Sequence, residues 1–402
     1  MFTTSLDQLT RYQRRWSRLL GKSTPRLPRP RTALRAVEAF GPNPGNLRML
    51  AYAPPRLAPG APLVVVLHGC KQNAPLYDQG TGWSALARRR GFAVLFPEQQ
   101  LGNNPRLCFN WFQPGDVAPD GGELASIDTM IGWMLERHGL DPARVFVTGL
   151  SAGGAMATAL LAVKPRRFAA GAIMAGLPYG AASSVGEAMH AMFHARRRDG
   201  ADWAARARQA SGHDGPWPRI SIWQGDDDET VVPANAAELE KQWTTLHGLD
   251  HLAPTTSTAD GHPHRSWVDA EGRIAVESHR IAGLAHGTPI APPHDGPGGR
   301  RISRMGVASD FVLDVGISST WRIAQSWGLA PQREDAPLLP AKPRAAPRPK
   351  VAAAPKAVVP AKRKVARKPR RAAGLGFDPG FGLRLAMAPI ASLRRMLGGR
   401  KR

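Results

Sequence analysis

Residues 144–156 read Arg-Val-Phe-Val-Thr-Gly-Leu-Ser-Ala-Gly-Gly-Ala-Met, a short apolar run followed by Gly-x-Ser-x-Gly and a series of small residues. The apolar run predicts a buried strand, and the small residues after the motif open a helical pattern. A serine at such a strand–turn–helix junction forms a nucleophile elbow, because the tight turn tolerates only very small neighbours and leaves the hydroxyl exposed. The stretch therefore predicts that Ser151 is a catalytic nucleophile.

The chain contains 402 residues, of which 43% are hydrophobic, so it is long enough to bury a large core. No apolar run approaches the length of about 18 residues that a transmembrane helix needs. The two cysteines, Cys70 and Cys108, are too few for a disulfide framework and lack the spacing of metal ligands. We therefore expect a globular body without a metal or a cofactor.

The formal net charge of +23 is concentrated at the two ends of the chain. Residues 1–40 contain 9 Lys/Arg and 2 Asp/Glu, and residues 331–402 contain 19 and 3. The intervening residues 41–330 contain 26 charges of each sign and are neutral. Any binding of a polyanion is therefore expected at the basic ends rather than on the body.

Residues 1–35 predict a basic N-terminal helix followed by a linker rich in Pro and Arg. The segment Ser5-Leu6-Asp7-Gln8 has the pattern of a capping box, and Leu9, Trp16 and Leu20 share one helical face. This helix either docks on the body or lies on a membrane or granule surface. Because the N-terminus lacks the basic-then-apolar pattern of a signal peptide, we expect a cytoplasmic protein, with attachment to a storage granule as a further hypothesis.

Residues 36–330 predict the catalytic domain, because buried apolar runs alternate there with helical patterns. Such alternation indicates a mainly parallel sheet flanked by helices, with the chemistry beyond the carboxyl ends of the strands. Strands are expected at about 33–40, 47–53, 63–67, 92–96, the elbow run, 168–174, 220–223, 267–269 and 274–281, and helices at about 83–90, 124–138, from 154 onward, and 234–247.

The segment 180–215 is expected to be an insertion between two strands. Met189, Met192 and Phe193 lie at helical spacing within it. This spacing suits a helix that roofs a substrate pocket and equally a pair of helices that pack on the surface.

Residues 331–402 consist largely of Ala, Pro, Lys and Arg, with little to bury, so we predict a disordered basic tail with a short amphipathic end at 381–397. Lysine and arginine clusters bind polyanions by releasing counterions. Because residues 331–373 contain no aromatic side chain, base stacking is not indicated. Nucleic acid, anionic lipid and the coat of a storage granule are the candidate partners, and a merely solubilising tail is the alternative.

A catalytic serine needs a histidine to accept its proton and a carboxylate to orient that histidine. With this elbow the order along the chain is serine, acid, histidine. His286 fits best, because it follows the strand that ends near residue 281; His264, in the pair His262/His264 that we expect in a loop, is the second candidate. Most of the other histidines between the elbow and the His286 loop are expected at the surface: His190, His194, His213, His247 and His251.

The acid should follow the strand at 220–223, where Asp226, Asp227 and Asp228 are adjacent. Three neighbouring carboxylates repel one another, so buried donors must hold one or two of them, which favours a functional loop over a solvated one. The residues alone do not choose between Asp226 and Asp228.

The oxyanion that forms during attack on a carbonyl needs backbone amides as donors. The amide of Ala152, directly after the nucleophile, is one candidate. The second is the amide of Cys70, which follows Gly69 in the loop after an early strand. Cys70 is also the alternative nucleophile, although it lacks an elbow and an assigned base.

Six motifs follow one another along the chain. They are His68-Gly69-Cys70-Lys71-Gln72, Pro97-Glu98-Gln99, Cys108-Phe109-Asn110-Trp111-Phe112, the elbow itself, 225–235 and 283–289. Together they resemble the polyhydroxybutyrate depolymerase family of esterases, whose relatives include feruloyl and acetylxylan esterases. The resemblance covers about residues 36–290. It implies an α/β-hydrolase fold and hydrolysis of short hydroxyacyl esters or oligomers, and its pattern Gly-x-x-Asp-x-x-Val selects Asp228 as the acid.

Two features depart from that family. Its secreted members carry a signal peptide and substrate-binding or linker domains, which we do not recognise in this sequence. The basic tail is not part of the family core, so the resemblance implies nothing about it.

Gln72, Asn110 and Trp111 are candidates for substrate contacts, although an aromatic cluster such as Trp111 and Phe112 also suits a core. Cys70 and its partner cysteine at 108 both follow strand ends on the site's side and could approach closely enough for a disulfide. A reducing cytosol would disfavour that bond.

We therefore expect a serine ester hydrolase in which Ser151 attacks the ester, His286 transfers the proton and Asp228 orients His286. Three alternatives stay open at this point. They are an acyltransferase with the same three residues, a feruloyl or acetylxylan type of carbohydrate esterase, and a granule- or polyanion-binding protein that uses the hydrolase body as a scaffold.

Overall fold

The computed structural model describes residues 32–291, 294–295, 301–302 and 305–331. The predicted N-terminal helix before residue 32 and the predicted basic tail after residue 331 lie outside the described residues. Among the described helices, none is both long and apolar enough to cross a membrane.

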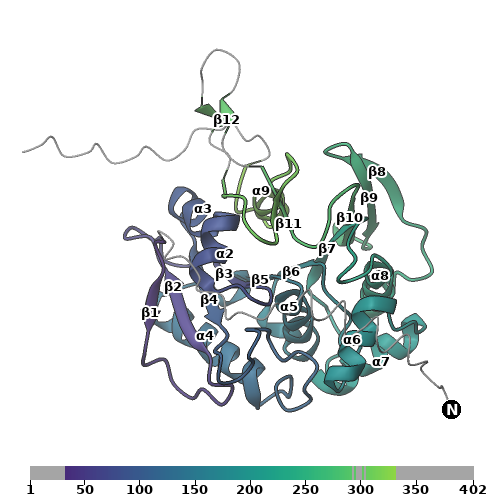
Figure 1. The fold of residues 1–402 in the computed structure, drawn as a ribbon, viewed down its shortest axis with the longest axis horizontal. Coiled ribbons are helices and arrows are strands. Elements are labelled where there is room, and N and C mark those ends of the chain that lie inside the picture. The colour runs from purple at the N-terminus through teal and green to yellow at the C-terminus, as the bar shows by residue number, and fades with distance from the viewer. Residues whose placement is uncertain (1–31, 292–293, 296–300, 303–304, 332–402) are drawn as a thin grey trace, which may run out of the picture. The chain divides into compact units, whose positions relative to one another are not determined.

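The main sheet is built from short strands (Figure 1), of which the central ones are buried and the edge strands β1 and β8 are mostly exposed. Two further pairs of short strands lie outside it. The main strands are β1 (Arg35–Val37), β2 (Arg48–Tyr52), β3 (Leu63–Leu67), β4 (Ala93–Glu98), β5 (Val145–Leu150), β6 (Ala170–Met174), β7 (Arg219–Gly225), β8 (Thr255–Ala259), β9 (His262–Val268) and β10 (Ile274–Ile281), and the small pairs are β11 (Thr288–Ile290) with β14 (Val312–Asp314) and β12 (His294–Asp295) with β13 (Arg301–Ile302).

The strands of the main sheet follow the order β1-β2-β4-β3-β5-β6-β7-β10-β9-β8. Neighbours from β4 to β10 are parallel, whereas β1, β2, β9 and β8 add antiparallel edges. The expected α/β-hydrolase fold with a mainly parallel sheet is confirmed. Because the carboxyl ends of the parallel strands meet along one edge, the loops that follow them are brought together there.

Two hydrophobic cores cover the two faces of the sheet. Along β3, Leu63, Val65 and Leu67 belong to one core, whereas Val64 and Val66 belong to the other, as the alternation of a strand requires. The first core is packed by α4 (Gly122–His138), α5 (Ala152–Val163), α7 (Gly200–Ser211) and α8 (Ala234–Leu246), and the second by α2 (Ala74–Thr81), α3 (Trp83–Arg90) and α9 (Ser319–Ser326); α6 (Val185–His194) lies beside the first group (Figure 1).

The expected strands and helices are present, with ends that differ by a few residues. The pair His262/His264 was expected in a loop, but it opens β9, because β8 pairs with this segment and extends the hairpin. Helices α2 and α9, each eight residues long, were not predicted from the sequence. Both depend on local caps, since Asn73 accepts the amide of Leu76 at 2.9 Å and Ser318 caps α9.

Candidate active site

Ser151 occupies the sharp turn between β5 and α5, with φ of 58° and ψ of −117°. The flanking glycines are required by close packing: a Cβ on Gly149 would lie 2.2 Å from the Gly153 carbonyl, and one on Gly153 would lie 2.5 Å from the His68 carbonyl. The Ser151 amide donates to the Met174 carbonyl at 2.9 Å, which ties the turn to β6. The strand–turn–helix predicted around the serine is confirmed.

His286 follows β10 and contacts a buried carboxylate. Its Nδ1 lies 2.7 Å from Oδ2 of Asp228, whose side chain is buried. The other oxygen, Oδ1, accepts the backbone amides of Thr230 and Val231, both at 2.8 Å, and Gln224 Nε2 reaches Oδ2 at 3.2 Å. The carboxylate is therefore held by the turn after β7, and it in turn fixes the imidazole by Nδ1 and leaves Nε2 available.

The structure distinguishes the two aspartates that residue types alone left open. Asp226 is exposed and lies 3.2 Å from Arg280 Nε, whereas Asp228 contacts His286. The alternative histidine, His264, lies in β9, where its Nε2 is 3.2 Å from Glu277 Oε2. Buried donors do hold one of the three adjacent carboxylates, as the expected repulsion requires.

The loop after β3 brings its backbone toward Ser151. The amide of Gly69 donates to Gln72 Oε1 at 2.9 Å, and Gln72 Nε2 donates to the carbonyl of Asp310 at 3.2 Å. Cys70 and Ala152 both line the cavity that contains Ser151. Ala152 is the first residue of α5, so its amide has no acceptor within the helix and is available to a ligand.

Gln72 was a candidate for substrate contact, and the structure gives it a different role. Its side chain is buried, does not line the cavity, and is bonded at both ends to the protein. Because it joins the Gly69 amide to the distant loop at Asp310, this side chain holds the loop after β3 in place instead.

His68 also holds the loop after β3 in place. Its Nε2 accepts the amide of Gln99 at 3.1 Å, so Nδ1 carries the proton and donates to the Gly69 carbonyl at 2.8 Å. Complete burial lowers the pKa of His68 to about 4. His68 is therefore neutral at neutral pH, and its two hydrogen bonds hold the Gly69 carbonyl and the Gln99 amide in place.

A disulfide joins Cys70 to Cys108, with their Cα atoms 4.2 Å apart. The bond connects the loop after β3 to the loop that precedes α4. Because the sulfur of Cys70 is part of this bond, Cys70 has no thiol to act as a nucleophile in this structure, which contradicts that alternative.

Glu123 of α4 organises the loop that contains Cys108. Its Oε2 accepts the amide of Asn110 at 2.8 Å, and its Oε1 accepts Gln99 Nε2 at 2.5 Å. Burial raises the pKa of Glu123 to about 8. Asn110 was expected to contact substrate, but its Oδ1 binds Asn104 Nδ2 at 2.9 Å and its side chain lines a neighbouring surface hollow rather than the cavity.

Ser151 and His286 line one cavity of about 300 Å³. Apart from these residues and the disulfide, its wall is mostly apolar and includes Trp111, which stays a candidate for substrate contact. Lys71, Arg106 and Asn104 provide a polar part. Other apolar wall residues are Phe112, Leu150, Leu177, Val185, Met192 and Phe311.

The insertion at 180–215 divides into two parts. Helix α6 contributes Val185, Met189 and Met192 to the cavity, as a roof would, while Phe193 is buried in the core. Helix α7 packs on α5 and α8 instead. Both expected arrangements therefore occur, one in each helix.

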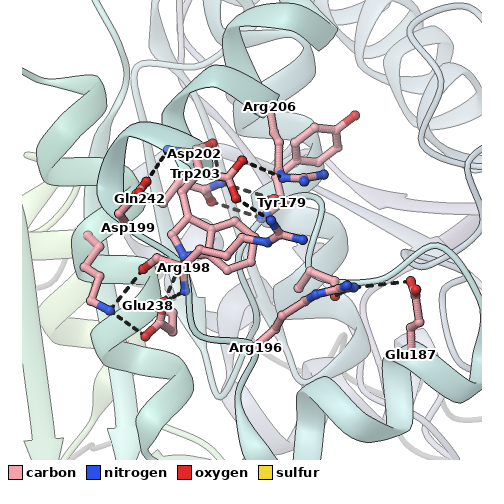
Figure 2. Close-up of polar contacts among 12 residues, drawn as sticks. Tyr179, Glu187, Arg196, Arg198, Asp199, Asp202, Trp203, Arg206, Glu238 and Gln242 are labelled. Carbon is pink, nitrogen blue, oxygen red and sulfur yellow. Dashed lines mark hydrogen bonds and ion pairs between the residues drawn. The ribbon is translucent and has the colours of Figure 1, made fainter. Parts of the chain in front are cut away.

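A polar network holds α7 and the preceding loop against α8 (Figure 2). Glu238 of α8 accepts the indole Nε1 of Trp203 at 2.9 Å and the backbone amide of Arg198 at 3.1 Å. Gln242, one turn further along α8, accepts the amide of Tyr179 at 3.0 Å. The insertion is thus fixed by buried side chains of a core helix.

Trp111 also borders a second hollow of about 510 Å³, whose wall contains three arginines. Arg196 Nη1 lies 3.4 Å from Glu187, and Arg198 and Arg206 both pair with Asp202 (Figure 2). Three guanidinium groups thus face two carboxylates, so this hollow carries excess positive charge beside the apolar cavity.

Phe311 was missed by the sequence analysis. It adopts a left-handed conformation with φ of 61°, and its ring meets that of His286 edge-on at 6.0 Å. The residue lies in a loop outside any periodic pattern, so no local signal indicated it.

Comparisons with known proteins identify relatives of this chain. The family model described as esterase PHB depolymerase matches residues 47–264. Poly(3-hydroxyalkanoate) depolymerase C of Paucimonas lemoignei is 44% identical over 294 residues, which cover 73% of this chain and 69% of that protein. An acetylxylan esterase of Coprinopsis cinerea is 32% identical over 267 residues, covering 65% and 70%. The solved structure of an acetyl xylan esterase from Aspergillus awamori gives a TM-score of 0.61 at 25% identity, covering 74% of this chain and all of that one.

Proposed function

The chain belongs to the PHB depolymerase family of esterases and is a carboxylic ester hydrolase, and from this we propose that it cleaves hydroxyacyl esters through Ser151, His286 and Asp228. One observation carries the proposal. His286 is bonded through Nδ1 to the buried Asp228 at 2.7 Å and shares a cavity wall with Ser151 at the elbow.

In the first step the Ser151 hydroxyl attacks the ester carbonyl while Nε2 of His286 accepts its proton. Asp228 keeps the imidazole in the tautomer with a proton on Nδ1 and stabilises the imidazolium that forms. The amides of Ala152 and Cys70 donate to the oxyanion. His286 then protonates the leaving alcohol, and an acyl group stays bound to Ser151.

In the second step water enters in place of the alcohol. His286 accepts a proton from the water, the resulting hydroxide attacks the acyl-enzyme, and Ser151 leaves with its proton restored. The oxyanion donors act again. They keep their positions because Gln72, His68 and the disulfide hold the Cys70 loop.

We propose a short hydroxyacyl ester, or an oligomer of 3-hydroxybutyrate, as the substrate. A cavity of about 300 Å³ with a mainly apolar wall suits a short aliphatic acyl unit. A hydroxyacid oligomer also ends in a carboxylate, for which the arginine-lined hollow beyond Trp111 offers partners. An acetylated carbohydrate, the substrate of the alternative esterase, has no such group.

The free carboxylate of a hydroxyacid oligomer allows an experiment that distinguishes this substrate from an acetylated carbohydrate. A hydroxybutyrate trimer with a free carboxylate should show a KM several-fold lower than its methyl ester, and Arg206→Gln should remove that difference while kcat for p-nitrophenyl butyrate stays unchanged. Equal KM values for the two trimers, or faster turnover of acetylated xylan than of either, would favour the carbohydrate esterase.

The decisive experiment for the catalytic residues is turnover of p-nitrophenyl butyrate by Ser151→Ala. The rate should fall by about 10³-fold or more, since removal of a nucleophile abolishes the acyl-enzyme route. Ser211→Ala is a matched control, because that hydroxyl donates to a carbonyl of its own helix. Full activity of Ser151→Ala would end the proposal. Adding an alcohol acceptor during the assay tests the acyltransferase alternative, for which the new ester would exceed the free acid.

The basic ends lead to a separate proposal, namely contact with a polyanion or a granule surface. The excess charge of residues 331–402 supports it. A chain that ends at Pro331 should retain esterase activity and lose salt-sensitive binding to anionic vesicles or DNA. Unchanged binding would assign that contact to the body.

A further inference from the structure

Three metal-ligating side chains converge on the antiparallel extension of the sheet, away from the catalytic cavity. Strands β9 and β10 pair so that His264 lies opposite His279. Glu277 lies two residues before His279, and side chains two apart on a strand share a face. All three side chains are largely buried, with exposed fractions of 12%, 14% and 12% for His264, Glu277 and His279.

The distances between the ligand atoms suit a bound ion. Glu277 Oε2 lies 3.2 Å from His264 Nε2 and 3.6 Å from His279 Nε2, and the three ligand atoms all lie within 4.8 Å of one another. A tetrahedral zinc ion with bonds of about 2.0–2.1 Å separates its ligand atoms by roughly 3.3–3.4 Å. Two of the three distances between ligand atoms therefore already lie close to those of a zinc site.

The outer contacts of the two imidazoles also match a metal site. His264 Nδ1 lies 3.0 Å from the Ser257 hydroxyl of β8, an oxygen that can accept its proton and leave Nε2 free for a metal. The His279 ring stacks on Trp223 at 3.9 Å with an angle of 13°, which fixes its orientation. Metal-binding histidines are usually oriented by such second contacts.

The charged neighbours on these strands point elsewhere. Arg265 pairs with Glu240 at 2.7 Å, and Arg280 donates to the Pro233 carbonyl at 2.8 Å, so both side chains reach toward α8. The two guanidinium groups adjacent in sequence to the histidines therefore do not occupy the face on which His264 and His279 meet.

From this geometry we propose that His264, Glu277 and His279 bind one divalent transition-metal ion, with Zn²⁺ as the preferred ion and water at the fourth position. Two imidazoles and one carboxylate suit Zn²⁺, Co²⁺ and Ni²⁺, whereas Mg²⁺ and Ca²⁺ prefer oxygen ligands throughout. None of the three residues lines the catalytic cavity, so the ion stabilises the β9–β10 extension and takes no part in ester cleavage. Neither histidine spacing nor cysteine spacing indicated this site in the sequence.

The test uses the full chain after removal of metals with a chelator. Calorimetric titration with ZnCl₂ should show one ion bound per chain, and the melting temperature should rise by several degrees, whereas MgCl₂ should produce neither effect. Glu277→Gln and His264→Ala should each weaken Zn²⁺ binding at least tenfold. His251→Ala, which alters an exposed histidine, is the matched control. Residues 332–402 contain neither histidine nor cysteine and cannot supply competing ligands of those kinds.

Two further measurements keep the result interpretable. The absorption spectrum of the Co²⁺ form should show the strong visible bands of a four-coordinate site, and Glu277→Gln, which preserves side-chain volume, should lose them. Turnover of p-nitrophenyl butyrate should be the same with and without Zn²⁺. Absence of stoichiometric Zn²⁺ binding, or equal binding by Glu277→Gln and the parent protein, would overturn the proposal and leave the cluster as an ion-pair network.

Discussion

The loop after β10 and the face of β9–β10 each place histidine against a carboxylate, but they use opposite ring nitrogens. In the loop, His286 meets Asp228 through Nδ1 at 2.7 Å, so Nε2 stays available. On the strands, His264 and His279 both direct Nε2 at one oxygen of Glu277. In the proposed mechanism the first arrangement orients one imidazole toward the Ser151 hydroxyl, whereas the second gathers several donor atoms around one carboxylate oxygen.

The two carboxylates differ as well. Backbone amides of the turn after β7 occupy one oxygen of Asp228, so this group is fixed by the chain itself. Glu277 is instead contacted by two side chains, His264 of β9 and His279 of its own strand β10. Contact between histidine and carboxylate is therefore weak evidence for catalysis, and the nitrogen used and the nearby nucleophile decide the role.

Asp228→Asn should have the largest effect on this comparison. An amide cannot hold the Nδ1–H tautomer or stabilise an imidazolium, so kcat for p-nitrophenyl butyrate should fall about 10³- to 10⁴-fold while the fold persists. Glu277→Gln makes the same chemical change in the other contact and should leave kcat within about twofold. Equal losses in the two variants would remove the distinction between the contacts.

Removal of the disulfide is expected to have the next largest effect. Both of its cysteines line the cavity that contains Ser151, and neither belongs to the cluster at His264. Closing a loop between residues 38 apart is expected to stabilise the protein by about 3–4 kcal/mol. A double variant, Cys70→Ala with Cys108→Ala, should lose stability of that order in urea unfolding. It should also lose activity, because the loop that contains Cys70, the proposed oxyanion donor, is no longer bonded to residue 108.

The disulfide between Cys70 and Cys108 also gives a test of the cellular compartment in which the protein resides. Disulfides persist in oxidising compartments and are rare in a reducing cytosol, so cytoplasmic location stays a prediction. Thiol titration of protein isolated under alkylating conditions tests it. Two free thiols would agree with the cytoplasmic prediction, and none would point to an oxidising compartment.

Glu123 is a third buried carboxyl, and it has neither a histidine nor a cation as its bonded partner. Burial raises its pKa to about 8 in the folded chain, against 4.5 for a solvent-exposed glutamate, so the folded state retains a proton that the unfolded state loses. This contribution to stability is complete below pH of about 4.5 and is lost as the pH rises through 8, by up to about 1.4 kcal/mol per pH unit. Glu123→Gln should flatten the dependence measured by urea unfolding between pH 5 and 8, and an unchanged slope would contradict this account.

Features set by local chemistry were predictable from the sequence. The elbow depends on an apolar strand and on glycines within five residues of each other, and His286 follows from chain order. Residue type alone could not decide between Asp226 and Asp228, because the choice depends on which carboxylate is buried and bonded to Gln224. The family pattern selected Asp228.

Features that depend on distant segments could not be predicted. Gln72 looked suited to substrate, but its amide is taken by Gly69 and by Asp310, 238 residues away. Phe311 reaches the cavity from a loop without periodicity. The cluster at His264 required the pairing of β9 with β10, which places residues 13 and 15 positions apart on one face.

Asp226→Asn should have the smallest effect, and it is the closest control for Asp228→Asn because the two positions share a loop. Asp226 is exposed and pairs with Arg280, and an exposed ion pair contributes at most about 1 kcal/mol. We expect kcat to change by less than about twofold and the free energy of unfolding by less than about 1 kcal/mol. Loss of activity in Asp226→Asn together with an active Asp228→Asn would reverse the assignment of the acid. If both variants lost activity, the loop as a whole, rather than one buried carboxylate, would be what orients His286.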